Sequence, residues 1–328
     1  MKSLSRNSAI IVLLGFVSLA ARGALAAEDE AADRAGFWID LYFGEPIAYE
    51  EMLEDLAGSQ VIYLGERHRL ERHHEIQAGI ITALANQGVP LVLGLEQLET
   101  YQQPILDRYN RGQIDFDKLA ELTDWGNRWH GYEQYRPVVE AAHKAGAPVL
   151  ALNARSETIR KIARSGGLTK LDAQTRKELP KEIQTDDPPY EKLLSIFMRV
   201  HVAATAERLR PMLEAQIARD ESMAAALCRF LESKQGKGRT AVVVCGSGHV
   251  NYSLGTAARV RRRIPEIKDR VILLSGSGDV VLAPSERAMA RKIRITHDQM
   301  RAINLPVADY LHATELKKGD RRAFLGDD

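Results

Sequence analysis

Residues 61–68 read VIYLGERH and residues 241–249 read AVVVCGSGH, so the same order of features occurs twice in the chain. Each stretch is an apolar run of strand length, followed by a glycine and, three residues after that glycine, by a histidine. Three further runs, at 91–95, 149–152 and 271–274, have the same apolar character, and helical stripes such as Ile76, Ile80 and Leu84 lie between the runs. Alternating strands and helices predict a parallel sheet that is covered on both faces. We therefore expect a three-layer α/β fold with a mainly parallel, doubly wound sheet.

The stretch from residue 155 to residue 238 differs from its surroundings. It contains helical stripes on either side of Pro188 and Pro189 but no convincing strand. We expect a helical insertion or cap over 155–238, and an α/β core domain built from residues 27–154 plus 239–328.

The amino terminus has the organisation of a secretory signal peptide. Lys2 and Arg6 precede an apolar stretch at 9–21, and Ala-Leu-Ala at 24–26 precedes an acidic segment. The apolar stretch is shorter than the roughly 20 residues of a membrane-spanning helix, and no cysteine follows it to form a lipobox. We expect cleavage after Ala26 and a periplasmic protein with no transmembrane segment in the mature chain.

Composition excludes several classes of protein. The chain has 328 residues, with 45 Lys and Arg against 44 Asp and Glu, and no basic half that would favour a nucleic-acid partner. Two cysteines are too few for a disulfide scaffold or a thiolate zinc site. Cys228 is predicted near the end of a helix and Cys245 near the far end of the next strand, so we expect two buried free thiols.

Polar side chains follow four of the predicted strands. Glu66 and His68 follow the first run, Glu96 the second and Asn153 the third, and His249 closes the motif after the fourth. The carboxyl ends of parallel strands meet at one edge of a sheet, where ligands bind in this class of fold. We therefore predict a functional site that gathers two carboxylates, two imidazoles and an amide.

The glycines of the second motif suggest close approach of the backbone to a ligand. Gly246 and Gly248 are predicted to allow positive φ there. The motif lacks the Gly-Lys-Ser/Thr of a P-loop and the third glycine of a dinucleotide fingerprint, and its glycine spacing does not fit a nucleophile elbow.

Helical positions supply further candidates for the site. His73 aligns with the apolar stripe of its helix, and His74 lies on the flank of that stripe. For both histidines, the alternative to ligand binding is a structural role in the core or at the helix end. In the predicted cap, polar side chains on apolar faces need partners, and a cleft beneath the cap would supply them. The candidate ligand-binding residues are His73, His74, Asn153, Gln216, Asp220 and Gly248, with Tyr190 and His201 as further candidates.

With these residues the chain resembles the ChaN-like haem-binding family within the Tiki and TraB superfamily, which also includes the erythromycin esterases. The resemblance rests on both Gly-x-x-His motifs and on a set of residues that runs through most of the chain. This set comprises Leu64 to His68, His73-His74, Leu95-Glu96, Trp125, Trp129, Tyr132, Leu150 to Asn153, Gln216, Arg219-Asp220, Met223-Ala224 and Gly246 to Val250.

The resemblance implies an exported protein that takes part in haem or iron uptake and dimerises around haem. It also implies a tyrosine ligand for the haem iron. The candidates for the axial ligand are Tyr190, His201, Tyr252 and Tyr310. Apolar residues of the cap would form the slot for the porphyrin, and arginines such as Arg155 and Arg219 would bind the propionates.

The same residues also fit a hydrolase similar to the Tiki proteases or the erythromycin esterases. Glu66, His68 and His249 would hold a divalent metal ion, with Glu96 as the fourth group or the general base. Without a metal, His68 oriented by Glu66 could activate water directly. The sequence is therefore compatible with haem binding and with hydrolysis.

Overall fold

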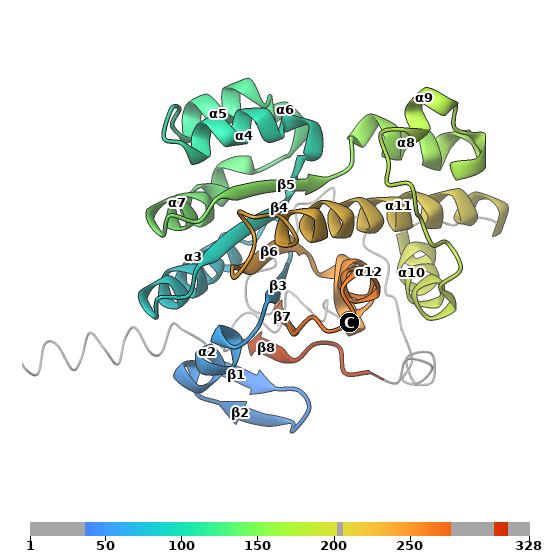
Figure 1. Ribbon diagram of the computed structural model, residues 1–328. Coiled ribbons are helices and arrows are strands. Elements are labelled where there is room, and N and C mark those ends of the chain that lie inside the picture. Colours follow the sequence, from blue (N-terminus) through green and yellow to red (C-terminus); the bar gives the residue numbers. More distant parts are fainter. Residues whose placement is uncertain (1–36, 202–205, 277–304, 314–328) are drawn as a thin grey trace, which may run out of the picture.

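The computed structural model describes residues 37–201, 206–276 and 305–313, and its centre is one mixed β-sheet (Figure 1). The strand order is β2-β1-β8-β7-β3-β6-β4-β5, and every pairing among β8, β7, β3, β6, β4 and β5 is parallel. This arrangement confirms the expected α/β fold class. The strands are β1 (Phe37–Asp40), β2 (Glu45–Ile47), β3 (Val61–Glu66), β4 (Leu91–Glu99), β5 (Val149–Asn153), β6 (Thr240–Gly246), β7 (Asp269–Leu274) and β8 (Tyr310–Ala313).

Helices cover both faces of the sheet (Figure 1). On one face, α3 and α7 pack against side chains such as Ile62 and Leu64 of β3. On the other face, α11 and α12 pack against Val61 and Tyr63 of the same strand. Consecutive β3 residues therefore enter opposite cores, as the two-residue period of a strand requires. The helices are α2 (Tyr49–Ala57), α3 (Glu71–Asn86), α4 (Gln103–Asn110), α5 (Phe116–Leu122), α6 (Trp125–Arg128), α7 (Arg136–Lys144), α8 (Ser156–Ser165), α9 (Ala173–Arg176), α10 (Pro188–His201), α11 (Ala206–Leu231) and α12 (Thr256–Arg263).

The five strands predicted from the apolar runs are present, but β1, β2 and β8 were not predicted. These three strands are short, and they form the antiparallel part of the sheet by pairing β1 with β2 and with β8. The sequence Glu45–Ile47 carries no apolar run, so periodicity gave no signal for it.

The outer edge of β5 is closed by amide side chains from α4. Asn110 donates to the carbonyl oxygen of Val149 over 3.0 Å and accepts from its N–H over 2.8 Å. Gln103 accepts from the N–H of Ala151 over 2.8 Å. These contacts replace the hydrogen bonds of a further strand, so they protect an edge that would otherwise be open to pairing with another chain.

The long helix α11 connects the region after β5 to the sheet. It packs against α8, β5 and α12, and its residues Met223 and Leu227 belong to the buried cluster on the sheet. Residues 156–201 form α8, α9 and α10, joined by loops and by η3 (Leu168–Lys170). The division into an α/β core and a cap at 155–238 stays a prediction.

Two other expectations concern the cysteines and the amino terminus. Cys228 and Cys245 are free and buried, as predicted. The predicted signal peptide at 1–26 lies outside the described residues. Within 37–201, 206–276 and 305–313, no helix has the length and apolar character needed to cross a bilayer.

Candidate functional site

The two Gly-x-x-His motifs lie side by side at the carboxyl edge of the sheet. β3 and β6 are parallel neighbours, and their register places Glu66 opposite Gly246. Each motif contributes one histidine that contacts a buried carboxylate. His68 contacts Glu66 on the α3 side of the sheet, and His249 contacts Glu96 and Asp220 on the α11 side. The predicted gathering of two carboxylates and two imidazoles at this edge is therefore present in the structure.

Glu66 is a buried carboxylate that accepts hydrogen bonds from several donors. Gln77 Nε2 lies 2.6 Å from Oε2 and Gln97 Nε2 lies 3.1 Å from Oε1, while the Tyr135 hydroxyl also donates to Oε1. Burial would raise the pKa of Glu66, but hydrogen bonds from His68 and His74 lower it to about 2. The carboxylate is therefore ionised and fixed in orientation.

His68 is the partly exposed member of this cluster. Its Nδ1 lies 2.8 Å from Glu66 Oε1, and its side chain is 38% exposed. The ring meets Trp129 edge to face, with centroids 4.9 Å apart. Burial would lower the pKa of His68, but the hydrogen bond to Glu66 and the charge of Glu96 raise it. With its proton on Nδ1 shared with Glu66, the neutral ring carries its lone pair on Nε2.

His73 and His74 are buried behind this site. The His73 Nδ1 accepts from the Arg67 N–H over 3.1 Å, and its Nε2 donates to the Ser275 carbonyl over 3.0 Å, so the ring joins the loop after β3 to the end of β7. Burial lowers the pKa of His73 to about 4. His74 Nδ1 lies 3.4 Å from Glu66 Oε2. Both histidines support the loop that carries His68.

His249 lies between two carboxylates. Its Nδ1 donates to Asp220 Oδ1 over 2.7 Å, and its Nε2 lies 3.1 Å from Glu96 Oε1. Burial would lower the pKa of His249, but the charges of Glu96 and Asp220 raise it to about 10. The opposing charge of His249 in turn holds the pKa of Glu96 well below its usual range, despite burial. His249 is therefore an imidazolium with both ring nitrogens engaged.

Gly246 and Gly248 do not have the positive φ that the sequence suggested. Gly246 has φ −59° and ψ 140°, and Gly248 is absent from the residues with positive φ. The reason for glycine at 246 is space, because an added Cβ would lie 2.8 Å from both Cε1 and Nε2 of His68. Positive φ in this loop occurs instead at Tyr252, Ser253 and Gly255, and Gly255, at +58°, lies against the His249 carbonyl.

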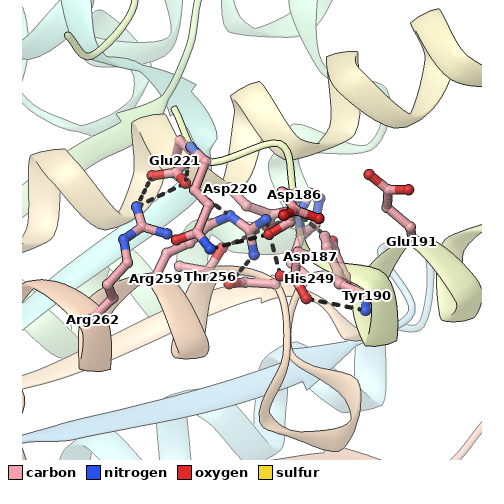
Figure 2. A network of polar contacts seen from close by, with 12 residues as sticks. Asp186, Asp187, Tyr190, Glu191, Asp220, Glu221, His249, Thr256, Arg259 and Arg262 are labelled. Atoms are coloured by element: carbon pink, nitrogen blue, oxygen red, sulfur yellow. Dashed lines mark hydrogen bonds and ion pairs between the residues drawn. The ribbon is translucent and has the colours of Figure 1, made fainter. Parts of the chain in front are cut away.

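A buried polar network extends from His249 to the helices of the region 155–238 (Figure 2). Asp220 of α11 accepts from the Tyr190 hydroxyl of α10 over 2.6 Å and from Thr256 Oγ1 of α12 over 2.8 Å. The buried guanidinium of Arg259 lies over the Tyr190 ring, 4.8 Å from its centroid. It also lies 3.4 Å from Glu221. The network fixes α10, α11 and α12 relative to the site.

Of the remaining residues predicted for the site, Asn153 and Gln216 lie in it and Tyr310 lies elsewhere. Asn153 donates to the backbone oxygen of Glu96 over 2.8 Å, and the Gln216 side-chain nitrogen lies 3.1 Å and 3.2 Å from the His249 ring nitrogens. Tyr310 lies on β8 and donates to Asp55 of α2, away from this cluster. The side chain of His201 lies outside the described residues.

Several residues of the site were missed by the sequence reasoning. Gln77, Gln97 and Tyr135 all donate to Glu66, and Thr256 donates to Asp220. Gln77 and Tyr135 share the apolar faces of their helices, so the pattern assigned Tyr135 to the core. Gln97 lies within a register irregularity of β4, between Leu95 and Glu99, that no local sequence pattern predicts.

The arrangement does not favour the metal centre expected at Glu66, His68 and His249. Glu66 accepts hydrogen bonds from Gln77, Gln97, Tyr135 and His68, and both ring nitrogens of His249 face carboxylates, so neither side chain offers a free lone pair. Across the part of the chain that the structure describes, no group of three or more His, Cys, Asp or Glu side chains is placed to hold a metal ion.

Comparison with known proteins identifies the family. The sequence model of the haem-binding uptake family of the Tiki superfamily, ChaN, matches residues 52–260. This match covers more than half of the chain and includes both histidine motifs, so the chain belongs to that family. A search of curated proteins finds no match.

One of the similar solved structures shares the fold of this chain. The chain is similar to ChaN of Campylobacter jejuni, whose structure is described as showing cofacial heme binding, with 20% identity, a TM-score of 0.62, and coverage of 85% of this chain and 97% of that one. An erythromycin esterase, EreC, has 12% identity and a TM-score of 0.41 over 72% of this chain and 76% of its own. A toxin effector domain from Vibrio vulnificus, RRSP, has 15% identity and a TM-score of 0.38 over 72% and 36%.

Proposed function

We propose that the protein binds haem at the carboxyl edge of its sheet, beneath the helices of residues 155–238, and serves haem or iron uptake. The observation that carries this proposal is the family match over residues 52–260, which includes every strand end of the site. The fold similarity to ChaN of Campylobacter jejuni supports it at the level of architecture.

The side chains at this edge fit what haem requires, namely a donor for iron, apolar contacts and cations for the propionates. His68 supplies a partly exposed imidazole, and the Trp129 ring lies beside it. Arg219 of α11 is partly exposed and lies near enough to Glu96 to lower the pKa of that carboxyl. When bound, haem would supply an iron that takes nitrogen or oxygen ligands from the protein.

Two of the tyrosines proposed as axial ligands have hydroxyl groups that donate to a carboxylate. Tyr190 is fully buried, and its hydroxyl donates to Asp220. Tyr310 is also buried, and its hydroxyl donates to Asp55. Tyr252 is partly exposed and borders the apolar cluster around Tyr190. Among the three described tyrosines that we predicted as axial ligands, Tyr252 is the one whose hydroxyl donates to no carboxylate.

We also propose export to the periplasm with cleavage after Ala26, and dimerisation around haem. The basic and apolar segments of residues 1–26 support export. Sequencing the amino terminus of the protein recovered from the periplasm tests the cleavage site. Light scattering with and without haem tests the dimer, which is contradicted if the mass stays that of one chain at saturation.

A second candidate function is metal-free hydrolysis. The ionised, fixed Glu66 orients His68 in the way that a general base requires. Haem binding remains the better supported function, because the family match carries it. Hydrolysis would become the better supported function if the wild-type protein failed to bind haem and hydrolysed an ester that the His68→Ala variant does not hydrolyse.

The direct test of haem binding is a titration of residues 27–328 with ferric haem, followed by optical spectroscopy. We expect a saturable Soret shift with a defined stoichiometry. A shift no larger than that of the heat-denatured chain would contradict the proposal.

A further inference from the structure

We propose that the protein has a second binding site, at the amino edge of the sheet, for a small molecule that carries two or more carboxylate or phosphate groups. The site is a cavity of about 480 Å³ at the start of β5, and a cavity of about 330 Å³ continues it along that strand. Volumes of this size are typical of small-molecule sites. The haem site proposed above lies at the opposite edge of the sheet, so this inference stands independently of it.

The walls of this site come from three connections between helices and strands. They are the end of α4 with Asn110 and Arg111, the turn at 146–148 before β5, and the loop at 235–239 before β6. Asp107 and Asn110 line both cavities, so the two are continuous. The site is therefore built from separate elements at the end of the sheet and not from one surface loop.

Positive charge dominates the lining of the two cavities. Arg111 and Arg239 line the first cavity, and Arg229 lines the second. In the part of the chain that the structure describes, none of these three arginines forms an ion pair. The described lining residues include one carboxylate, Asp107, which accepts from Gln103 over 2.9 Å. Three guanidinium groups against one carboxylate leave an excess of positive charge that a ligand with two anionic groups would balance.

Arg239 is held in place before any ligand binds. Its Nε donates to the Gln235 carbonyl over 3.0 Å, and its Nη1 donates to the Leu91 carbonyl over 2.8 Å. Leu91 begins β4, so the second contact ties the guanidinium to the sheet. A guanidinium carries five N–H donors, and among the described residues Nη2 has no protein acceptor. A fixed guanidinium with free N–H groups matches the geometry of a carboxylate or phosphate.

The helix ends at this edge offer a second role for basic side chains. Arg111 caps the end of α4, and Arg229 lies in the last turn of α11. Cations there can stabilise a helix dipole, which is equivalent to about half an elementary charge. This role does not account for Arg239, which precedes β6 and donates to the start of β4. Arg239 is therefore the residue that distinguishes a binding site from helix stabilisation.

The test is a calorimetric titration of the mature protein, residues 27–328, with citrate and with pyrophosphate, supported by the shift of Tm that each ligand causes. We expect saturable binding that weakens by about 10-fold or more in Arg239→Gln and in Arg111→Gln, because each loses hydrogen bonds to a charged group. Arg111→Gln guards against misfolding, since that side chain is exposed and contacts Gln113 alone in the described part of the chain. Tighter binding of citrate would assign carboxylates as the ligand groups, and tighter binding of pyrophosphate would assign phosphates.

Arg108→Gln is the matched control. It removes the same charge from an exposed position of α4 that lines neither cavity, so it should bind like the wild type. If Arg108→Gln weakens binding as much as Arg111→Gln, the anions are attracted by overall charge and the site is refuted. If the wild type binds neither probe while Arg111→Gln lowers the stability in urea, Arg111 serves the helix dipole and the proposal fails. Loss of binding in the arginine variants with an unchanged haem titration would separate this site from the haem site.

Discussion

Replacing Gly246 by alanine perturbs the site at one well-defined contact. The residue has φ −59° and ψ 140°, which alanine adopts without strain. At such a position a change from glycine to alanine normally stabilises a protein by about 0.4–1 kcal/mol, because it restricts the unfolded chain. Here the new Cβ would lie 2.8 Å from Cε1 and Nε2 of His68. That distance is too short for carbon in contact with a ring, so the His68 ring must move.

The expected cost follows from what the His68 ring loses. Displacement breaks its hydrogen bond to the ionised Glu66, and a hydrogen bond to a charged group contributes about 1.5–3 kcal/mol. After the gain from restricting the unfolded chain is subtracted, we expect Gly246→Ala to lower the free energy of unfolding by about 0.5–2.5 kcal/mol. The pKa of His68 should also fall, because the hydrogen bond to Glu66 is a leading cause of its elevation.

Gly248→Ala is the matched control. An added Cβ at Gly248 meets nothing within 4 Å, so this variant should be as stable as the wild type or slightly more so. Urea unfolding measures both free energies, and NMR titration of the His68 ring protons measures its pKa. The reasoning is refuted if Gly246→Ala equals Gly248→Ala in stability and leaves the pKa of His68 unchanged.

Three further predictions concern the supporting groups. The pKa of His249 is about 10 in the folded protein and about 6.5 in the unfolded chain. Between these pH values the contribution of His249 to the free energy of unfolding should fall by about 1.4 kcal/mol per pH unit as the pH rises. A neutral His249 ring in the folded protein at pH 8, detected by NMR, would contradict this. The pKa of His73 is about 4 in the folded protein, below that of the unfolded chain, so its contribution to the free energy of unfolding is present above pH 6.5 and is lost as the pH falls toward 4. In a His73→Gln variant the free energy of unfolding should therefore decline less steeply below pH 6.5. An unchanged decline would be evidence against this role of His73. Asn110→Ala leaves the N–H and the carbonyl of Val149 without these partners and should cost about 1–3 kcal/mol in urea unfolding, whereas a loss below 0.5 kcal/mol would show that water replaces the amide.

The central strands could be predicted because they are buried on both faces. β3, β4, β5, β6 and β7 each contain a continuous apolar run, and such runs are the signature of a covered parallel sheet. Their carboxyl ends then placed Glu66, His68, Glu96 and His249 at one edge without knowledge of the strand order. The short strands β1, β2 and β8 carry no such signal.

The detailed roles within the site depend on contacts between distant elements. Tyr135 is 69 residues from Glu66 in the sequence, and Asp220 is 29 residues from His249. Nothing local indicates that Tyr135 donates to a carboxylate instead of filling the core. The contacts that compete with a metal at Glu66 and His249 were hidden for the same reason, because the donors to Glu66 and the carboxylates beside His249 come from other helices and strands.

The most direct test of the account is hydrogen–deuterium exchange of residues 27–328 with and without ferric haem, read by mass spectrometry. Binding at the carboxyl edge predicts haem-dependent protection in the segments 67–70, 128–132 and 247–254, which carry His68, Trp129 and His249. Protection confined to other regions, such as the β1–β2 hairpin, or no protection at haem saturation, would contradict the proposed site.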